Sequence, residues 1–442
     1  MGRLARAMTV VAIAAALFVA GSVGLGLVRG DRAPAGRTMP MAPSSVFLGP
    51  GDPASLDRTI EALQERVKKF PEDGHGWASL GLAYVRQARI TADPRYYPRA
   101  DRALRRSLRI LPGNQDALLG LAALAAAEHD FEAALTLGTR ARDLNPYDAN
   151  AHGIVGDALV ELGRYGKGFA SFQTMVDTRP DTASFARVSY ARELLGDLPG
   201  AIRAMQQARG YAGTPADAAW TSHHLGLLYL NQGRLPRASE MFRDGARLDP
   251  SSVQTLLGLS TVALARNDVP KAVRLMENVV GRSPTPEFAI ALGDLSRLSG
   301  DGAAAERHYD LARVGLELLV RSGANADLET ALFEADHGNP AGALAAAEAA
   351  WAERRSIQAA DAMAWALHAN GREDEAARYA RRARSLGTRD GLLFYHAGVI
   401  ELARGNHEAG RSLLRRALAV DPWFSILGPQ DAGRLLRSGS AG

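Results

Sequence analysis

The sequence predicts an all-α protein, a solenoid of about ten helix–turn–helix units that follows one N-terminal hydrophobic helix. Prolines recur at intervals of 34 residues, as at Pro112, Pro146 and Pro180, and this interval is the length of a helix–turn–helix repeat. Small residues occupy two fixed positions in successive units. Hydrophobic residues make up 47% of the 442-residue chain and aromatic residues only 6%. Alanine is abundant, and a core built on alanine and leucine favours close-packed helices over a β-sandwich.

Residues 1–29 are predicted to be a signal anchor or a signal peptide. Arg3 and Arg6 precede residues 8–28, which carry no charge. At about 1.5 Å per residue this stretch spans the ~30 Å hydrocarbon core of a bilayer, whereas the apolar part of a signal peptide has only about 7–15 residues. An uncleaved anchor is therefore favoured, with most of the chain on the outer side of the cytoplasmic membrane. The alternative is secretion after cleavage, for which residues 33–36 (APAG) are the best candidate site.

Residues 30–53 are predicted to be a flexible tether, because they are rich in Pro, Gly, Arg and Ser and show no apolar period. Within the hydrophobic segment before them, small residues recur at every fourth position from Ala12 to Gly24. Such a stripe would allow a homodimer through the membrane helix. In so alanine-rich a segment, chance recurrence is the favoured explanation.

The solenoid itself is predicted over residues 74–424. Counting back from the prolines gives repeat starts near 74, 115, 149, 182, 219, 253, 286, 324, 357 and 391. Residues 54–73 are predicted to form a half-repeat helix before the first unit, and residues 425–442 a capping helix and tail. Solenoids need such solvated ends because an internal repeat contacts a neighbour on both sides.

A family resemblance accompanies this spacing. The stretch WASLGLAYVRQ (residues 77–87) places a tryptophan, a Leu-Gly pair and a tyrosine at helical spacing, and residues 223–242 (HHLGLLYLNQGRLPRASEMF) carry much of the same pattern. Both resemble the W-x-x-L-G-x-x-Y pattern of tetratricopeptide repeats, and the chain is similar to bacterial membrane-anchored members of that family with unassigned roles. The resemblance implies a right-handed superhelix whose concave face is lined by the first helix of each unit.

The eighth and twentieth residues of each unit are small. The two helices of a unit cross closest where these residues meet, so a large side chain there would hold the helix axes apart. The structural small positions include Gly81, Ala100, Ala134, Gly156, Gly226, Ala238, Ala272, Gly293, Ala305 and Gly398. Glycine is also expected at the turn between the two helices, where a left-handed residue closes the first helix. The turn glycines are Gly163, Gly196, Gly233, Gly300, Gly338, Gly371 and Gly405.

The first unit departs from the pattern, because seven extra residues lie between its helices, around residues 88–100. Tyr96 and Tyr97 belong to this longer connection. One interpretation is a helix extension packed on its neighbour, which is favoured. The other is a loop that docks a partner.

No catalytic, cofactor-binding or metal-binding residue is predicted. The chain has no cysteine, which excludes disulfides, thiol catalysis and cysteine-ligated metals. Its ten histidines show no metal-ligand spacing such as H-E-x-x-H. A net charge of +4, from 52 Lys and Arg against 48 Asp and Glu, is not a nucleic-acid signature, since that requires a concentrated basic face. We therefore predict a protein that is not an enzyme and carries no cofactor.

The resemblance also implies a partner-binding groove on the concave face. Carried over by repeat position, the candidate contacts are Arg86, Asn150, Asp157, Glu161, Tyr190, Trp220, His223, Asn231, Asp294, Arg297, Trp365, His368 and Tyr395. Tryptophan and tyrosine are common anchors for a peptide or helix, although packing between neighbouring helices explains each residue taken alone. The predicted function is a non-enzymatic scaffold that binds a protein or peptide partner at the membrane. The alternative is a secreted or membrane-anchored protein that binds a solute or metal through His223 or the tryptophans.

Overall fold

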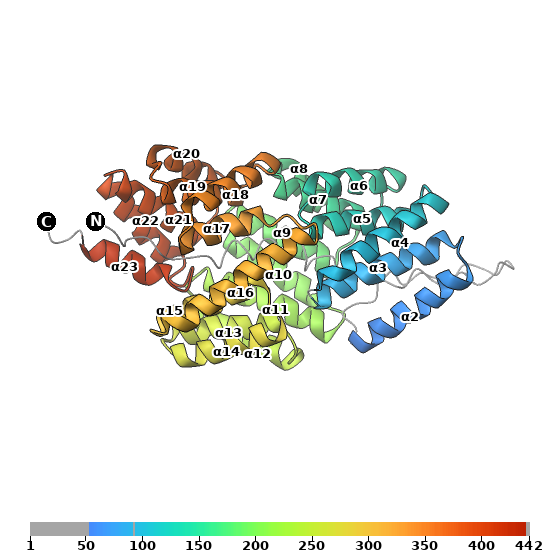
Figure 1. Cartoon of the computed structure of the whole chain (residues 1–442), viewed down its shortest axis with the longest axis horizontal. Coiled ribbons are helices and arrows are strands. Elements are labelled where there is room, and N and C mark those ends of the chain that lie inside the picture. The colour runs from blue at the N-terminus through green and yellow to red at the C-terminus, as the bar shows by residue number, and fades with distance from the viewer. Residues whose placement is uncertain (1–52, 92, 439–442) are drawn as a thin grey trace.

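The computed structural model describes residues 53–91 and 93–438, and in these ranges the chain forms twenty-two α-helices, one short 3-10 helix and no strand (Figure 1). The prediction of an all-α helical solenoid is confirmed. The predicted anchor (residues 1–29) and the tether up to residue 52 lie outside the described residues. Among the helices that the structure does describe, none has both the length and the apolar composition needed to cross a bilayer.

The helices follow one another through short links. Their bounds are α2 (Pro53–Lys69), α3 (Gly74–Thr91), η1 (Pro94–Tyr96), α4 (Tyr97–Ile110), α5 (Gln115–Ala127), α6 (Phe131–Leu144), α7 (Ala149–Glu161), α8 (Tyr165–Thr178), α9 (Thr182–Leu194), α10 (Leu198–Gly210), α11 (Pro215–Leu230), α12 (Leu235–Leu248), α13 (Val253–Ala265), α14 (Val269–Arg282), α15 (Pro286–Leu298), α16 (Gly302–Arg321), α17 (Asp327–His337), α18 (Pro340–Glu353), α19 (Ile357–Ala369), α20 (Glu373–Ala383), α21 (Gly391–Ala403), α22 (His407–Val420) and α23 (Gly428–Ser438).

Consecutive helices pack in ten pairs, from α3 with α4 to α21 with α22, between the single helices α2 and α23. The fifth pair begins at Pro215 rather than near residue 219, and the eighth at Asp327 rather than near residue 324. The fifth starts early because Thr214 caps α11 by accepting a hydrogen bond from the N–H of Asp217, with proline at the first helical position. The eighth starts late because α16 continues to Arg321.

The turn inside most pairs is closed by a residue with left-handed backbone. All seven predicted turn glycines have a positive φ, from 69° at Gly233 to 106° at Gly338. In the second and sixth pairs, His129 (φ 62°) and Asn267 (φ 60°) hold the same place, which a side chain makes sterically less favourable than glycine. Asp130 then caps the following helix by accepting a backbone hydrogen bond. The turns are thus fixed by short-range backbone chemistry.

Close crossings between the paired helices occur at the small positions. A Cβ added at Gly226 would lie 2.4 Å from the ring of Phe242. Where the eighth residue is Ser189, its hydroxyl donates a 2.8 Å hydrogen bond to the backbone oxygen of Ala201, the twentieth residue. A Cβ would also lie under 3.0 Å from a side chain at Gly81, Gly156, Gly293 and Gly398. The five alanines named among the structural small positions are all 0% exposed: Ala100, Ala134, Ala238, Ala272 and Ala305.

The extra residues of the first unit extend its helix. The helix α3 runs to Thr91 and is followed by the 3-10 helix η1 before α4 begins. Tyr96 and Tyr97 are half-buried and pack against the hydrophobic core around α2 to α5. The ring centroid of Tyr96 lies 6.1 Å from that of Tyr84. This packing favours the helix extension over a docking loop.

The coiled path brings each of three units against the unit six places further along the chain, and in Figure 1 the helices α17 to α19 accordingly lie beside α7 and α8. We call this contact the seam. Its two sides are the turns 128–130, 162–164 and 195–197 and the links 322–326, 354–356 and 384–390.

Hydrogen bonds hold the seam at each of its three levels. The N–H of Asn325 donates to the carbonyl oxygen of Glu128 at 2.8 Å, and Nδ1 of His129 lies 2.7 Å from the carbonyl oxygen of Asn325. The N–H of Ile357 donates to the hydroxyl of Tyr165 at 2.7 Å. These partners are more than 190 residues apart in sequence, so the seam is a long-range contact.

Side chains add to the seam. The hydroxyl of Thr388 donates to the carbonyl oxygen of Leu194 at 2.5 Å. The guanidinium of Arg354 lies 5.3 Å from the ring centroid of Phe131 and 3.8 Å from a carboxylate oxygen of Glu161. Both Arg354 and Glu161 are buried, so this ion pair lies in the interior of the seam.

Apolar residues from both sides of the seam share one core. Val160 and Tyr190 belong to the same cluster of buried side chains as Ile357 and Leu393. The interior of the solenoid is therefore filled by the chain's own units. This filling decides which surfaces remain open to a partner.

Candidate functional site

Seven of the thirteen predicted groove residues are buried within the fold. They are Asp157, Glu161, Tyr190, His223, Asp294, Trp365 and Tyr395. Their polar groups serve the fold: Nε1 of Trp365 donates to Asp336 at 2.8 Å, and the hydroxyl of Tyr395 donates to Asp431 at 2.9 Å. In this conformation these side chains have no surface for a partner, because neighbouring units and the seam cover them.

The other six predicted groove residues are half-buried. They are Arg86, Asn150, Trp220, Asn231, Arg297 and His368. Most contact a neighbouring helix: Arg179 donates to Asn150 at 2.6 Å, and Asn231 donates to Glu193 at 3.1 Å. They are spread from α3 to α19 and do not converge on one site.

The described residues contain no arrangement that suggests metal binding. In residues 53–91 and 93–438, no three His, Cys, Asp or Glu side chains are grouped so as to hold a metal ion. The rings of His223 and His224 are 5.3 Å apart, and Trp220 covers His224 with ring centroids at 4.1 Å. Burial lowers the pKa of His223 to about 4, so this imidazole is neutral near pH 7 and packs as a core side chain.

Carboxyl groups on the first helices of three pairs are withdrawn from solvent: Glu161 and Asp294 are buried, and Glu193 is half-buried. Burial raises the pKa of Glu161 and Glu193 to about 7 and that of Asp294 to about 8. Oδ1 of Asp294 accepts a 2.9 Å hydrogen bond from the hydroxyl of Tyr309, whereas Oδ2 has no hydrogen-bond partner among the described residues. Ionising such groups in place is costly because the few polar contacts around them compensate only part of the lost hydration.

We expect stability to fall as pH rises from about 6.5 to about 8.5. A carboxyl whose folded pKa is raised above its unfolded value of about 4 binds more protons when folded, so its stabilisation is full below about pH 4, decreases as the pH rises and is gone once the pH exceeds the folded pKa. The lowered pKa of His223 acts in the opposite sense, but only below about pH 6.5. Urea denaturation at a series of pH values measures the slope.

The variant Asp294→Asn isolates one contributor to this slope. The amide keeps an acceptor for the hydroxyl of Tyr309 but does not titrate. We expect a flatter pH dependence and a more stable variant at about pH 8, since each unit of pKa shift corresponds to about 1.4 kcal/mol. A slope identical to that of the unmodified chain would show that Asp294 titrates normally in the folded state.

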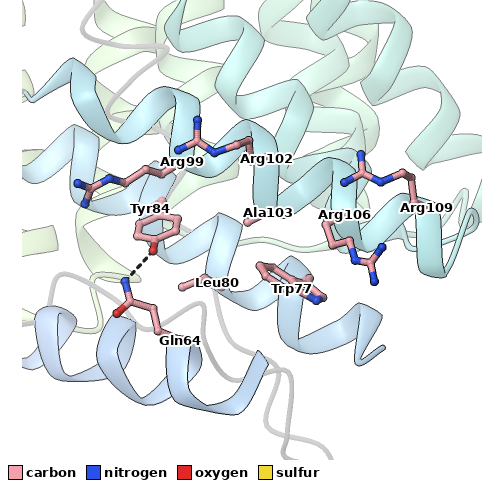
Figure 2. Close-up of a pocket in the computed structure, with 9 residues that line it drawn as sticks. All are labelled: Gln64, Trp77, Leu80, Tyr84, Arg99, Arg102, Ala103, Arg106 and Arg109. Carbon is pink, nitrogen blue, oxygen red and sulfur yellow. Dashed lines mark hydrogen bonds between the residues drawn. The ribbon is translucent and has the colours of Figure 1, made fainter. Parts of the chain in front are cut away.

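An accessible hollow lies on the outer side of the solenoid, between α2 and α4, with α3 as its floor (Figure 2). We call it the outer groove. Its volume is about 670 Å³. Its lining residues are Gln64, Trp77, Leu80, Tyr84, Arg99, Arg102, Ala103, Arg106 and Arg109.

Four arginines of α4 line one wall of the outer groove: Arg99, Arg102, Arg106 and Arg109. Their spacing of three, four and three residues places them on one face of the helix. Arg106 pairs with the exposed Glu72 at 2.6 Å. Arg102 and Arg109 are exposed and form neither an ion pair nor a hydrogen bond with another described residue. The wall is therefore a row of positive charge, only part of which is neutralised.

The floor of the outer groove is aromatic and aliphatic. It consists of Trp77, Leu80 and Tyr84, which share one face of α3. Their polar atoms are already paired: Nε1 of Trp77 donates to the carbonyl oxygen of Pro71 at 2.9 Å, and the side chain of Gln64 donates to the hydroxyl of Tyr84 at 2.8 Å. The floor thus offers apolar contact, and the arginine wall offers charge.

Comparison with protein families decides the identity of the repeat. A family model described as tetratricopeptide repeat matches residues 124–184, 224–285 and 257–316. The matched ranges cover helix pairs in both halves of the solenoid. The chain contains tetratricopeptide repeats.

Comparison with curated proteins gives no match for this tetratricopeptide repeat protein. Solved structures that it resembles include the APC/C hetero-tetramer Cut9-Hcn1, with a TM-score of 0.46 and 16% identity over 83% of this chain and 63% of that chain. The human IFIT1 dimer with m7Gppp-AAAA gives a TM-score of 0.49 and 15% identity over 75% of this chain and 77% of that chain. Yeast Tom70 gives a TM-score of 0.38 and 12% identity over 87% of this chain and 96% of that chain. At such identities we transfer neither function nor partner.

The outer groove has a counterpart elsewhere in this tetratricopeptide repeat protein. A hollow of about 620 Å³ lies between α8 and α10. Its floor is formed by Phe185, Val188 and Arg192, which stand at the same repeat positions as the three floor residues of the outer groove. The hollow between successive second helices is thus a feature of the repeat, whereas the row of four arginines is particular to α4.

The arginines of α4 are not among the site residues predicted from the sequence. The family resemblance directs attention to the first helix of each unit, and α4 is a second helix. The signal was present nonetheless, because residues 99–109 contain five arginines and one aspartate. Spacings of three and four residues among them indicate one charged helix face.

Proposed function

We propose that this tetratricopeptide repeat protein is a non-enzymatic scaffold that binds a protein or peptide partner. The observation that carries the proposal is the outer groove, an exposed hollow that combines an apolar floor with arginines that have no ion-pair partner among the described residues. Arginine and aromatic residues are enriched at protein interfaces. The half-buried predicted groove residues, such as Trp220, stay the alternative contact region, on the concave face.

Site-specific photocrosslinking in the native host tests this function. A photoreactive amino acid at the exposed position Gln64 places the probe in the outer groove, and one at Trp220 places it on the inner face. The matched control is Gln206 in the counterpart hollow. We expect a discrete protein adduct from Gln64 and none from Gln206. An adduct from Trp220 alone would move the interface to the concave face, and no adduct from any of the three positions would overturn the proposal.

We further propose that residues 1–29 present the solenoid on the outer side of the cytoplasmic membrane. The support is the sequence: residues 8–28 carry no charge and follow Arg3 and Arg6. Membrane fractionation and the mass of the native N-terminus test this. We expect the intact chain in the membrane fraction. A soluble chain that begins near residue 35 would instead indicate a cleaved signal and secretion.

A further inference from the structure

We propose that the outer groove receives an acidic segment of a protein partner. This inference rests on the scaffold function proposed above and names the chemistry of its partner. Its basis is the row of arginines on α4 that line the hollow, and Figure 2 shows Arg106 of this row pointing toward Trp77.

The positive charge of the arginine row is largely uncompensated. Between residues 99 and 109, α4 carries five arginines and one aspartate. Like charges three or four residues apart on a helix repel each other and destabilise it. The one ion pair within the row, Arg106 with Glu72, is exposed, with Glu72 78% accessible, and such pairs contribute little. An anion bound along the row would relieve the repulsion around Arg102 and Arg109.

The length of the arginine row matches that of a short extended peptide. The arginine row spans ten residues of helix, which is about 15 Å at the rise of an α-helix. An extended peptide covers this distance with about five residues. Guanidinium groups bind carboxylates through short, bidentate, charge-assisted hydrogen bonds. A segment with several glutamates or aspartates therefore matches the row in both length and chemistry.

The aromatic floor of the outer groove favours a peptide over a nucleic acid. Proteins that bind single-stranded nucleic acid stack the bases on exposed aromatic rings. Here Tyr84 is only 7% exposed and its hydroxyl is bonded to Gln64. The indole N–H of Trp77 is bonded to Pro71. Tyr84 therefore offers little ring surface to a base, and the half-buried ring of Trp77 suits contact with an apolar side chain of the peptide.

Peptide binding by the full chain in a non-ionic detergent tests the proposal. The probe is a fluorescein-labelled peptide of alternating glutamate and leucine, and its fluorescence anisotropy is measured at several salt concentrations. We expect saturable binding that weakens with salt. In the variant Arg102→Glu/Arg109→Glu we expect the affinity to fall at least about tenfold, from the loss of two charge-assisted contacts. Far-UV circular dichroism checks that the variant is folded.

Two controls separate the groove from general charge. The variant Arg203→Glu/Arg237→Glu makes the same change in net charge at exposed positions away from the outer groove, and we expect it to bind within about twofold of the unmodified chain. A peptide with glutamine in place of glutamate should not bind. Equal losses in the two double variants, or full binding by Arg102→Glu/Arg109→Glu, would overturn the proposal.

Other ligand classes are outcomes of the same assay. Tighter binding of a labelled oligo-uridylate RNA, or of phosphatidylserine vesicles, with the same dependence on Arg102 and Arg109 would replace the acidic peptide by that ligand. Photocrosslinking at Gln64 separates rejection of the acidic segment from rejection of the scaffold function. A protein adduct at Gln64 without acidic-peptide binding would retain the scaffold and reject only the acidic segment.

Discussion

Replacing Arg187 with methionine is expected to lower the free energy of unfolding by about 3–5 kcal/mol. The guanidinium is 2% exposed and binds the carboxylate of Asp157 at 2.6 Å and 2.9 Å, while Nη1 donates to the carbonyl oxygen of Ala183 at 3.2 Å. Methionine fills much of the same volume but leaves Asp157, itself 4% exposed, without a counter-charge. Urea denaturation measures the loss. Amide hydrogen exchange in α7 and α9 is measured as well, because repeat arrays can unfold in segments and a single unfolding free energy can miss a local loss.

Two further variants show whether burial is the cause of this loss. Arg237 pairs with Glu240 at 3.0 Å with both side chains more than half exposed, so Arg237→Met is expected to cost at most about 1 kcal/mol. The double variant Arg187→Met/Asp157→Leu leaves no buried charge and should recover most of the stability. Equal losses in Arg187→Met and Arg237→Met would contradict a buried pair. A large loss in the first alone would assign Asp157, a predicted groove residue, to the fold.

The helix pairs were predictable because their determinants lie within one repeat. Gly226 faces Phe242 across a single pair, and Ser189 bonds to Ala201 twelve residues away. Turn residues such as Gly233 act on their immediate neighbours. A fixed period repeats these local rules along the chain, so the sequence shows the same pattern many times. The two displaced starts, at α11 and α17, arise where a cap and a long preceding helix shift the boundary.

The seam could not be predicted in the same way. It joins units six places apart, so its existence depends on the sum of small rotations between successive pairs. Glu161 and Arg354 meet there, 193 positions apart, and neither has a local pattern that points to the other. For this reason the sequence placed Glu161, Tyr190 and Trp365 in an open groove, whereas the structure buries them.

The repeat pattern predicted only part of the outer groove. The floor residues Trp77, Leu80 and Tyr84 are among the residues that carry the family resemblance. The same side chains form the base of a hollow between α2 and α4, where Leu80 and Tyr84 are buried and Trp77 is half-buried. The row of arginines belongs to α4 alone. It is not part of the pattern that the repeats share, so the repeat pattern does not predict it.

The seam makes two glycines with similar backbones differ in their tolerance of a side chain. Gly163 (φ +74°) and Gly371 (φ +71°) both close a turn in left-handed conformation. An alanine at Gly371 would meet no atom within 4 Å, whereas the Cβ at Gly163 would lie 2.4 Å from the carbonyl oxygen of Arg355. We expect Gly371→Ala to cost about 1–2 kcal/mol through backbone strain. Gly163→Ala should cost about 1–3 kcal/mol more, through overpacking against the seam.

Hydrogen exchange locates the extra loss, because the N–H of Ile357 donates to the hydroxyl of Tyr165 across the seam. Ile357 is the first residue of α19, where no helical partner protects its amide. This amide should therefore exchange faster in Gly163→Ala but not in Gly371→Ala. Small-angle scattering should show a larger radius of gyration only for Gly163→Ala, since opening the seam lengthens the solenoid. Equal costs in the two variants, with Ile357 unprotected in the unmodified chain, would mean that the seam is open in solution and the concave face accessible to a partner.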